Sequence, residues 1–261
     1  MSPTPTLSIA VLTLNEAHQL ADCLQSAQFA DQLLVIDSGS TDGTPDLAAR
    51  LGARSVHAYP DWQGFAEQRN RALSHCHSDW VLFLDADEVI PPQLALEIQA
   101  VVAHNRPGVY SLAWTQVAYG RTLTHMRAGK GQPRLFPRQQ ILHFKGVVHE
   151  GAVMNNPALP RTTLQHRLLH HSRRTIHQSL LKMAQYAQLG AMKRAQAGKR
   201  GGLIRGTASG LAAFVRTYIV QRGFTGGREG FLYCLTVALE SFFRYVALAV
   251  DRDQLTNPAT R

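Results

Sequence analysis

The chain has 261 residues, of which 45% are hydrophobic and 17% are charged, and it contains neither an internal repeat nor a low-complexity segment. This length and composition indicate one or two domains with a substantial core. The net charge of +9 is unevenly divided: residues 1–150 carry 11 Lys and Arg against 14 Asp and Glu, whereas residues 151–261 carry 16 against 4.

The first two predicted strands each end at polar residues. Residues 7–14 form an apolar run that ends at Asn15 and Glu16, and an apolar helical pattern follows over residues 20–27. Residues 33–36 form a second run, which ends at Asp37. The small residues after it, Gly39 among them, permit a tight turn, and residues 40–42 can cap a helix that begins near Thr44.

The third predicted strand, residues 81–84, is short and β-prone and ends at Asp85. Asp85 and Asp87 lie two residues apart, so in extended backbone they share a face and can approach one hard cation or a ribose hydroxyl. The alternative is a solvated acidic turn. Three strand ends that deliver polar groups to one sheet edge predict a nucleotide-binding crevice.

Three motifs, at residues 13–16 (Thr-Leu-Asn-Glu), 37–44 (Asp-Ser-Gly-Ser-Thr-Asp-Gly-Thr) and 85–87 (Asp-Ala-Asp), carry a family resemblance. In order and spacing they resemble the motifs of family 2 inverting glycosyltransferases with the GT-A fold, over roughly the first 150 residues. The resemblance implies a Rossmann-like α/β fold, with a mostly parallel sheet flanked by helices. It also implies a nucleotide-sugar donor, usually UDP-linked.

The resemblance further implies the roles of individual residues. Asp87, with Asp85, is expected to coordinate Mg²⁺ or Mn²⁺. Arg69 and Asn70 resemble the helix that lies under the nucleotide in this family, and the alternative is an ordinary amphipathic helix with its Arg heads in water. The residues expected to contact the nucleotide sugar are Leu14, Asn15, Glu16, Asp37, Gly39, Arg69, Asp85 and Ala86.

Residues 108–150 are expected to select the acceptor and to supply the catalytic base. Family 2 members often carry a Glu-Asp base pair and a Gln-x-x-Arg-Trp motif, and neither is present here. Instead, residues 133–138 (Pro-Arg-Leu-Phe-Pro-Arg) and 144–151 (Phe-Lys-Gly-Val-Val-His-Glu-Gly) resemble a subgroup similar to the lipopolysaccharide-core β-1,4-glucosyltransferases.

We predict Glu150 as the base, because it follows a strand-like run and is the only acid between Glu97 and Glu229. His149 is a second candidate, since an imidazole titrates near neutrality. The alternative for both is an exposed strand end. Arg134 or Lys130 is expected to add positive charge beside the diphosphate.

Residues 156–261 are predicted to form a basic helical extension, with a domain boundary near residue 155, where turn-forming residues gather. Residues 231–250 are long and apolar enough to span a membrane, but Glu240 and Arg244 in their middle are costly in lipid. Two interpretations stay open: an interfacial helix on a membrane, and a helical pair packed on the catalytic domain.

His166, His170 and His171 could lie on neighbouring helical faces, which suggests zinc. We reject zinc, because no Cys or carboxylate joins them at a ligand-like spacing; a basic, anion-facing surface is favoured. The three cysteines are isolated and the amino terminus lacks the pattern of a signal peptide. A cytoplasmic enzyme, peripheral at the inner membrane, is therefore expected.

The predicted activity is a metal-dependent, inverting hexose transfer to a lipid-linked or polyanionic glycan, such as lipopolysaccharide core. Asp85 to Val89 also fits the nucleophile motif of haloacid-dehalogenase-like phosphatases, but two strands precede it and acids are nearly absent downstream. A non-enzymatic module that binds membranes or nucleic acid is the third alternative. No array of stacking aromatic residues supports binding to nucleic acid, so no nucleic-acid partner is expected.

Overall fold

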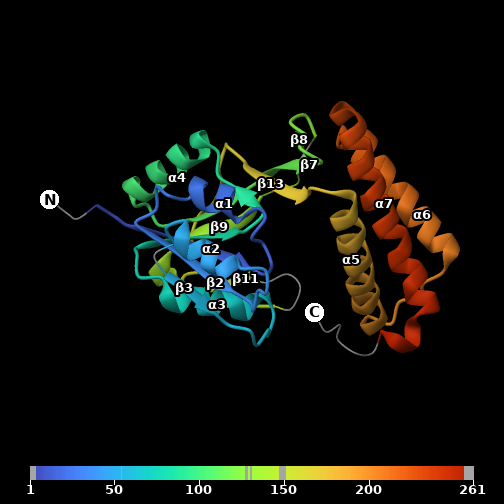
Figure 1. Cartoon of the computed structure of the whole chain (residues 1–261), viewed down its shortest axis with the longest axis horizontal. Coiled ribbons are helices and arrows are strands. Elements are labelled where there is room, and N and C mark those ends of the chain that lie inside the picture. The colour runs from blue at the N-terminus through green and yellow to red at the C-terminus, as the bar shows by residue number, and fades with distance from the viewer. Residues whose placement is uncertain (1–3, 54, 127–128, 130, 147–150, 256–261) are drawn as a thin grey trace. The chain divides into compact units, whose positions relative to one another are not determined.

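The computed structural model describes residues 4–53, 55–126, 129, 131–146 and 151–255 (Figure 1). It divides into two compact units, the first formed by residues 1–114 and 129–170 and the second by residues 115–128 and 171–261. These bounds differ from the division expected at residue 155. The cause is strand pairing, because β12 (Arg161–Thr163) pairs with β6 (Val109–Leu112) and thereby continues the first sheet.

The first unit is built on a seven-stranded sheet whose central strands are parallel. β1 (Leu7–Thr13) pairs in parallel with both β2 (Gln32–Asp37) and β4 (Trp80–Asp85), and β9 (Gln132–Pro137) is antiparallel to β4. Two smaller pairings complete the unit: the antiparallel hairpin of β10 (Ile141–Lys145) and β11 (Gly151–Met154), and the short pair of β5 (Glu88–Val89) with β13 (Leu168–Arg173). In sheet order the seven strands are β12, β6, β9 (Gln132–Pro137), β4 (Trp80–Asp85), β1 (Leu7–Thr13), β2 (Gln32–Asp37) and β3 (Ser55–Ala58).

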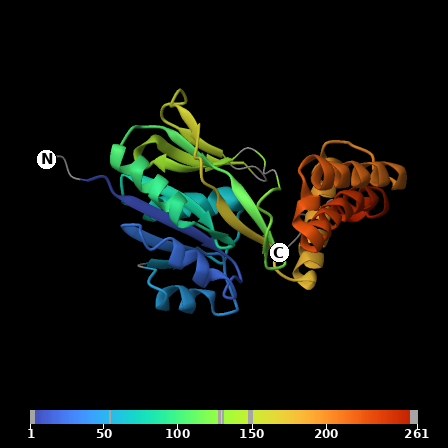
Figure 2. The same ribbon diagram turned by 90° about the horizontal axis from the view of Figure 1, so that it is seen from above.

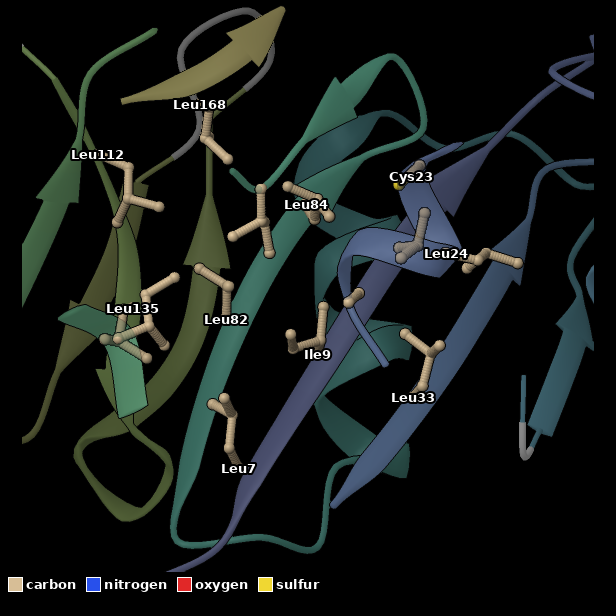
Figure 3. Packing of buried hydrophobic residues seen from close by; sticks show 14 of the residues in the cluster. Leu7, Ile9, Cys23, Leu24, Leu33, Leu82, Leu84, Leu112, Leu135 and Leu168 are labelled. Atoms are coloured by element: carbon tan, nitrogen blue, oxygen red, sulfur yellow. The ribbon is translucent and has the colours of Figure 1, made fainter. Parts of the chain in front are cut away.

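Helices cover both faces of this sheet, because its central strands are apolar on both sides. Alternate residues of β1, such as Ile9, face a core that includes residues of α1 (Leu20–Ser26), α2 (Thr44–Arg50) and α4 (Pro92–His104) (Figure 3). The other face packs on α3 (Phe65–His75). The α/β fold with a mostly parallel sheet and flanking helices is thus confirmed.

The second unit contains the helical extension. α5 (Ile176–Gln196), α6 (Leu203–Phe214) and α7 (Gly227–Val250) lie side by side (Figures 1 and 2). β7 and β8 add a short hairpin. The elements are β7 (Trp114–Ala118), β8 (Arg121–Thr122), α5 (Ile176–Gln196), α6 (Leu203–Phe214), a π-helical turn η2 (Val215–Val220), a 3-10 turn η3 (Gly223–Gly226), α7 (Gly227–Val250) and a 3-10 turn η4 (Arg252–Gln254); a further 3-10 turn, η1 (Arg138–Gln140), belongs to the first unit.

Candidate functional site

The carboxyl ends of β1, β2 and β4 meet at one edge of the first sheet. In the parallel register Thr13 lies opposite Asp37, and Leu12 lies opposite Asp85. The three strand ends that were singled out in the sequence therefore come together. This edge is where ligands bind in open α/β sheets.

The loops after β1 and β2 are joined by hydrogen bonds. The N–H of Asn15 donates to Oγ of Ser40 (2.7 Å), and Oδ1 of Asn15 accepts from the N–H of Thr41 (2.9 Å). The N–H of Glu16 donates to Oγ1 of Thr44 (3.0 Å). Asn15 adopts a left-handed backbone conformation (φ 56°), which Asn tolerates better than most residues. The half-buried Leu14 and the exposed Asn15 thus sit on a loop that its neighbour holds in place.

Asp37 is buried and organises its own turn. Its carboxylate accepts hydrogen bonds from Oγ1 of Thr13 (2.9 Å) and from the N–H groups of Gly39 (2.9 Å) and Ser40 (2.7 Å). Gly39 has φ +93°, and a Cβ atom there would lie 3.1 Å from Cα of Pro60, so the turn requires glycine. The motif itself does not indicate this structural role of Asp37, and the contact of Asp37 with the nucleoside stays a prediction.

Two arginines hold Asp85. Its Oδ2 lies 2.8 Å from Nη2 of Arg134, and its Oδ1 lies 3.7 Å from Nη2 of Arg69. The same Nη2 of Arg134 lies 3.1 Å from Oε1 of Glu88, while Oε2 of Glu88 accepts the N–H of Asp85 at 3.0 Å. Arg134 and Glu88 are buried, and Ala86 between the two aspartates is also buried. Glu88 is therefore a part of the site that no sequence motif predicted.

The pKa values in this cluster follow from burial and charge. Burial acts to raise the pKa of Asp85, but the guanidinium groups of Arg134 and Arg69 outweigh it and hold that pKa well below its usual range. Burial raises the pKa of Glu88 to about 7, against the lowering effect of Arg134. At neutral pH Asp85 is therefore an anion fixed between two cations.

Asp87 faces His170, with Oδ2 and Nε2 3.4 Å apart. The antiparallel pairing of β5 with β13, in which His170 lies opposite Glu88, brings the two together. Two expectations are corrected here: His170 lies on a strand and not on a helix, and a carboxylate does adjoin it. Burial acts to lower the pKa of His170, but the hydrogen bond with Asp87 raises it above its usual value.

The Asp87 and His170 pair fits a divalent cation that takes its remaining ligands from a substrate. Carboxylate oxygen and imidazole nitrogen both bind Mn²⁺, and Mg²⁺ is commonly held by one or two carboxylates together with substrate phosphates. Among the described residues, no group of three or more His, Cys, Asp or Glu side chains could hold a metal ion. Within the part of the chain that the structure describes, Asp87 and His170 are thus the two ligands that this position offers, while Asp85 is paired with guanidinium groups and its role as a metal ligand stays a prediction.

Arg69 is buried, which contradicts the alternative of an Arg head in water. Its guanidinium lies over the rings of Phe83 and Phe144, at 5.4 and 5.9 Å from their centroids. The neighbouring Asn70 exchanges two hydrogen bonds with the backbone of Phe144, at 2.6 and 3.2 Å. Helix α3 therefore fixes Asp85 on one side and strand β10 on the other.

Three predicted residues, Glu150, His149 and Lys130, lie outside the described residues. Glu150 immediately precedes Gly151, where β11 begins. Their roles stay predictions.

The matches to known proteins agree with the motifs described above, and the matches to whole relatives extend over both units. The family model described as Glycosyl transferase family 2 matches residues 8–159. The lipopolysaccharide core biosynthesis glycosyltransferase LpsC of Rhizobium meliloti is 30% identical over 257 residues, which are 93% of this chain and 91% of the relative. An uncharacterized glycosyltransferase of Rickettsia bellii is 28% identical over 275 residues, covering 99% and 90%.

Among solved structures, the mannosyltransferase PcManGT of Pyrobaculum calidifontis, in complex with GDP-Man and Mn²⁺, is similar with a TM-score of 0.57. It is 17% identical, and the match covers 96% of this chain and 89% of that protein. At this identity the likeness concerns the fold.

Proposed function

Because the chain belongs to glycosyl transferase family 2, we propose that it transfers a hexose, such as glucose, from a UDP-linked sugar to a lipid-linked or polyanionic glycan. The observation that carries the proposal is the meeting of three polar strand ends beside the Asp87 and His170 pair. The relative named for lipopolysaccharide core biosynthesis supports a lipopolysaccharide-type acceptor. Such an acceptor places the enzyme at the cytoplasmic face of the inner membrane.

Asp87 and His170 would hold Mg²⁺ or Mn²⁺, which neutralises negative charge as it develops on the leaving diphosphate. Asn15 and Glu16, on the joined loops, would contact the nucleoside. Asp85, oriented by two arginines, would accept a hydrogen bond from the ribose. Arg134, and Lys130 from outside the described residues, would add positive charge around these anions.

Glu150, or His149 in its place, would remove the proton of the acceptor hydroxyl while that oxygen attacks the anomeric carbon. The attack comes from the face opposite the diphosphate, so a single displacement inverts the configuration.

Glu150→Gln is expected to lower turnover by about 10²- to 10⁴-fold, the usual contribution of a general base, and to leave donor binding intact. Steady-state rates and donor titration on the purified variant measure the two effects separately. Glu67→Gln, which neutralises a partly exposed acid paired with Arg71 on α3, is the matched control and should keep normal turnover. Near-normal turnover of Glu150→Gln, together with a large loss in His149→Gln, would transfer the role to His149.

The proposed function is tested by thermal shift with UDP, GDP, ADP, CMP and their sugar conjugates, each with and without Mn²⁺. A ligand at 100 times its Kd stabilises by about 2.7 kcal/mol, which is readily detected. Stabilisation by one nucleotide that depends on Mn²⁺ supports the proposal and identifies the nucleobase of the sugar donor. A response to beryllium fluoride, with none to any nucleotide, would favour the phosphatase alternative instead.

A further inference from the structure

The helix formed by α6 and η2 exposes an apolar surface. Ile204 is 87% exposed and Leu211 is 64% exposed. Residues 204, 208, 211 and 215 follow helical spacing, so they form one stripe along the helix. The large apolar side chains exposed on this helix, called here the α6 stripe, are Leu203, Ile204, Leu211, Val215, Ile219 and Val220.

The opposite face of the same helix is made of small residues. Gly206, Gly210 and Ala213 are buried. A Cβ atom on Gly206 would lie 3.0 Å from the carbonyl oxygen of Phe242, and one on Gly210 would lie 3.1 Å from that of Ala238, so α6 and α7 pack backbone to backbone. A helix of a water-soluble domain buries its large apolar residues and exposes polar ones. Small residues inside and large apolar residues outside are typical of helices that pack within lipid.

Helix α7 also exposes large apolar side chains. Phe231, Leu239, Phe243 and Val250 are exposed along it. Within the described residues, the segment Gly223–Val250 is long and apolar enough to cross a membrane, and only 17% of its most apolar window is buried. A core helix of the same composition would be mostly buried.

The charges in the middle of α7 are satisfied within the second unit. Glu240 accepts from Nη2 of Arg244 at 2.6 Å and lies 3.4 Å from Nη2 of Arg173. Neither Glu240 nor Arg244 is fully exposed. These two residues, which argue in the sequence against a helix that spans the membrane, therefore face other protein groups.

The turn between the two helices combines aromatic rings with exposed arginines. Tyr218 contacts Phe214 and Phe231, with ring centroids 5.0 and 5.8 Å apart, and Phe224 lies 6.3 Å away. Arg222 and Arg228 are exposed, as are Arg205 and Arg216 on the α6 helix. Aromatic residues and arginines of this kind favour the boundary between acyl chains and lipid headgroups.

We propose that the α6 stripe and the adjoining turn bind the surface of an anionic lipid bilayer, with the apolar side chains among the acyl chains and the four arginines on headgroup phosphates. The positive charge of the second unit favours an anionic bilayer over a second copy of the chain as the occupant of this surface. Residues 171–261 carry 14 Lys and Arg against 4 Asp and Glu, so two copies of this surface repel each other, whereas an anionic leaflet attracts it. Binding to the bilayer is argued from residues of the second unit alone. Only the link between this bilayer and a lipid-linked acceptor rests on the proposed function.

The test is co-sedimentation of the full chain with phosphatidylcholine vesicles, with and without phosphatidylglycerol, in the absence of any sugar donor. The wild type is expected to bind the anionic vesicles. The variant Ile204→Gln/Leu211→Gln/Val215→Gln should lose about tenfold or more in partition coefficient, because three apolar side chains no longer enter the bilayer. Leu96→Gln, which changes a 67% exposed leucine on α4 of the first unit, is the matched control and should bind as the wild type does.

A charge variant tests the second half of the proposal. Arg205→Gln/Arg216→Gln should weaken binding severalfold at low salt and less at high salt, whereas Arg50→Gln on α2 should not. Wild-type protein that stays in the supernatant with both vesicle types overturns the proposal. So does an equal loss in Leu96→Gln, or a dimer in light scattering that the triple variant converts to a monomer without any vesicle binding. Nucleotide-induced stabilisation is measured on each variant, so loss of lipid binding is distinguished from failure of the donor site.

Discussion

Asp87→Asn is expected to remove the metal dependence of nucleotide-sugar binding and to lower kcat/KM by about 10³- to 10⁵-fold. The amide keeps the shape of the carboxylate but loses its charge, so it is a poor ligand for Mg²⁺ or Mn²⁺. A cation at the leaving diphosphate stabilises the transition state by several kcal/mol, and each 1.4 kcal/mol corresponds to about one factor of ten. Donor titrations over a series of Mn²⁺ concentrations, followed by steady-state rates, measure both effects.

His170→Gln should weaken Mn²⁺ binding less than Asp87→Asn does, because it removes a neutral ligand and leaves the carboxylate. Asp46→Asn is the matched control, since Asp46 is an exposed aspartate in the first turn of α2. Its donor binding should keep the wild-type dependence on Mn²⁺. An Asp87→Asn protein with that same dependence would contradict the assignment of Asp87 and His170 as the metal pair.

Local sequence was sufficient to predict the sheet edge but not the partner of Asp87. The runs before Asn15, Asp37 and Asp85 identify buried strands, and parallel pairing then brings their carboxyl ends together. His170 reaches Asp87 because β13 pairs with β5 across about eighty residues of chain, and such long-range pairing leaves no local pattern.

The chemistry of single residues also concealed structural roles. Asp37 carries the charge expected of a ligand-binding residue, yet its carboxylate is used by Thr13 and by the backbone of its own turn. Glu88 has no predicted role in the sequence, yet it is buried beside Arg134, which lies on a different strand. The burial of these two side chains depends on the assembled sheet, so it cannot be predicted from a local motif.

The two interpretations of the helical extension were indistinguishable from composition. Both an interfacial helix and a packed helical pair present apolar residues at helical spacing. The structure shows that α7 packs against α5 and α6, while residues such as Phe243 stay exposed. The large residues on the exposed face of α6 and the small ones on its inner face support the proposal of an interfacial helix, and this contrast becomes visible only once the inner face of α6 is known.

Arg134→Met is expected to lower the free energy of unfolding by about 3–5 kcal/mol, the usual cost of removing one partner of a buried ion pair. Glu88, whose side chain is 2% exposed, would lose the guanidinium 3.1 Å away. Chemical denaturation measures the change. If the uncompensated carboxylate is the cause, the double variant Arg134→Met/Glu88→Gln should recover part of the lost stability. Recovery should be partial, because the amide has one acceptor oxygen where the carboxylate has two.

The pH dependence of this deficit has a definite sign. Burial already raises the folded-state pKa of Glu88 to about 7, and loss of Arg134 raises it further. An acid with a raised folded pKa contributes full stability below its unfolded pKa, and that contribution falls as pH rises through the folded value. Because both proteins share the same unfolded state, the deficit of Arg134→Met should grow as pH rises above the folded pKa of wild-type Glu88, from about pH 6.5 to pH 8. Asp85 acts differently: its lowered folded pKa contributes stability that is lost only in more acidic solution, so it adds a constant over this range.

Arg138→Met separates this effect from the loss of any arginine. The guanidinium of Arg138 donates to the carbonyl oxygens of Cys76 and Leu73, at 3.3 and 3.0 Å, and these do not titrate. Its deficit should be the same across the pH range, whereas that of Arg134→Met should not. A deficit of Arg134→Met that stays constant or shrinks with rising pH would show that Glu88 is neutral in the folded protein, and Arg134 would then serve Asp85 alone.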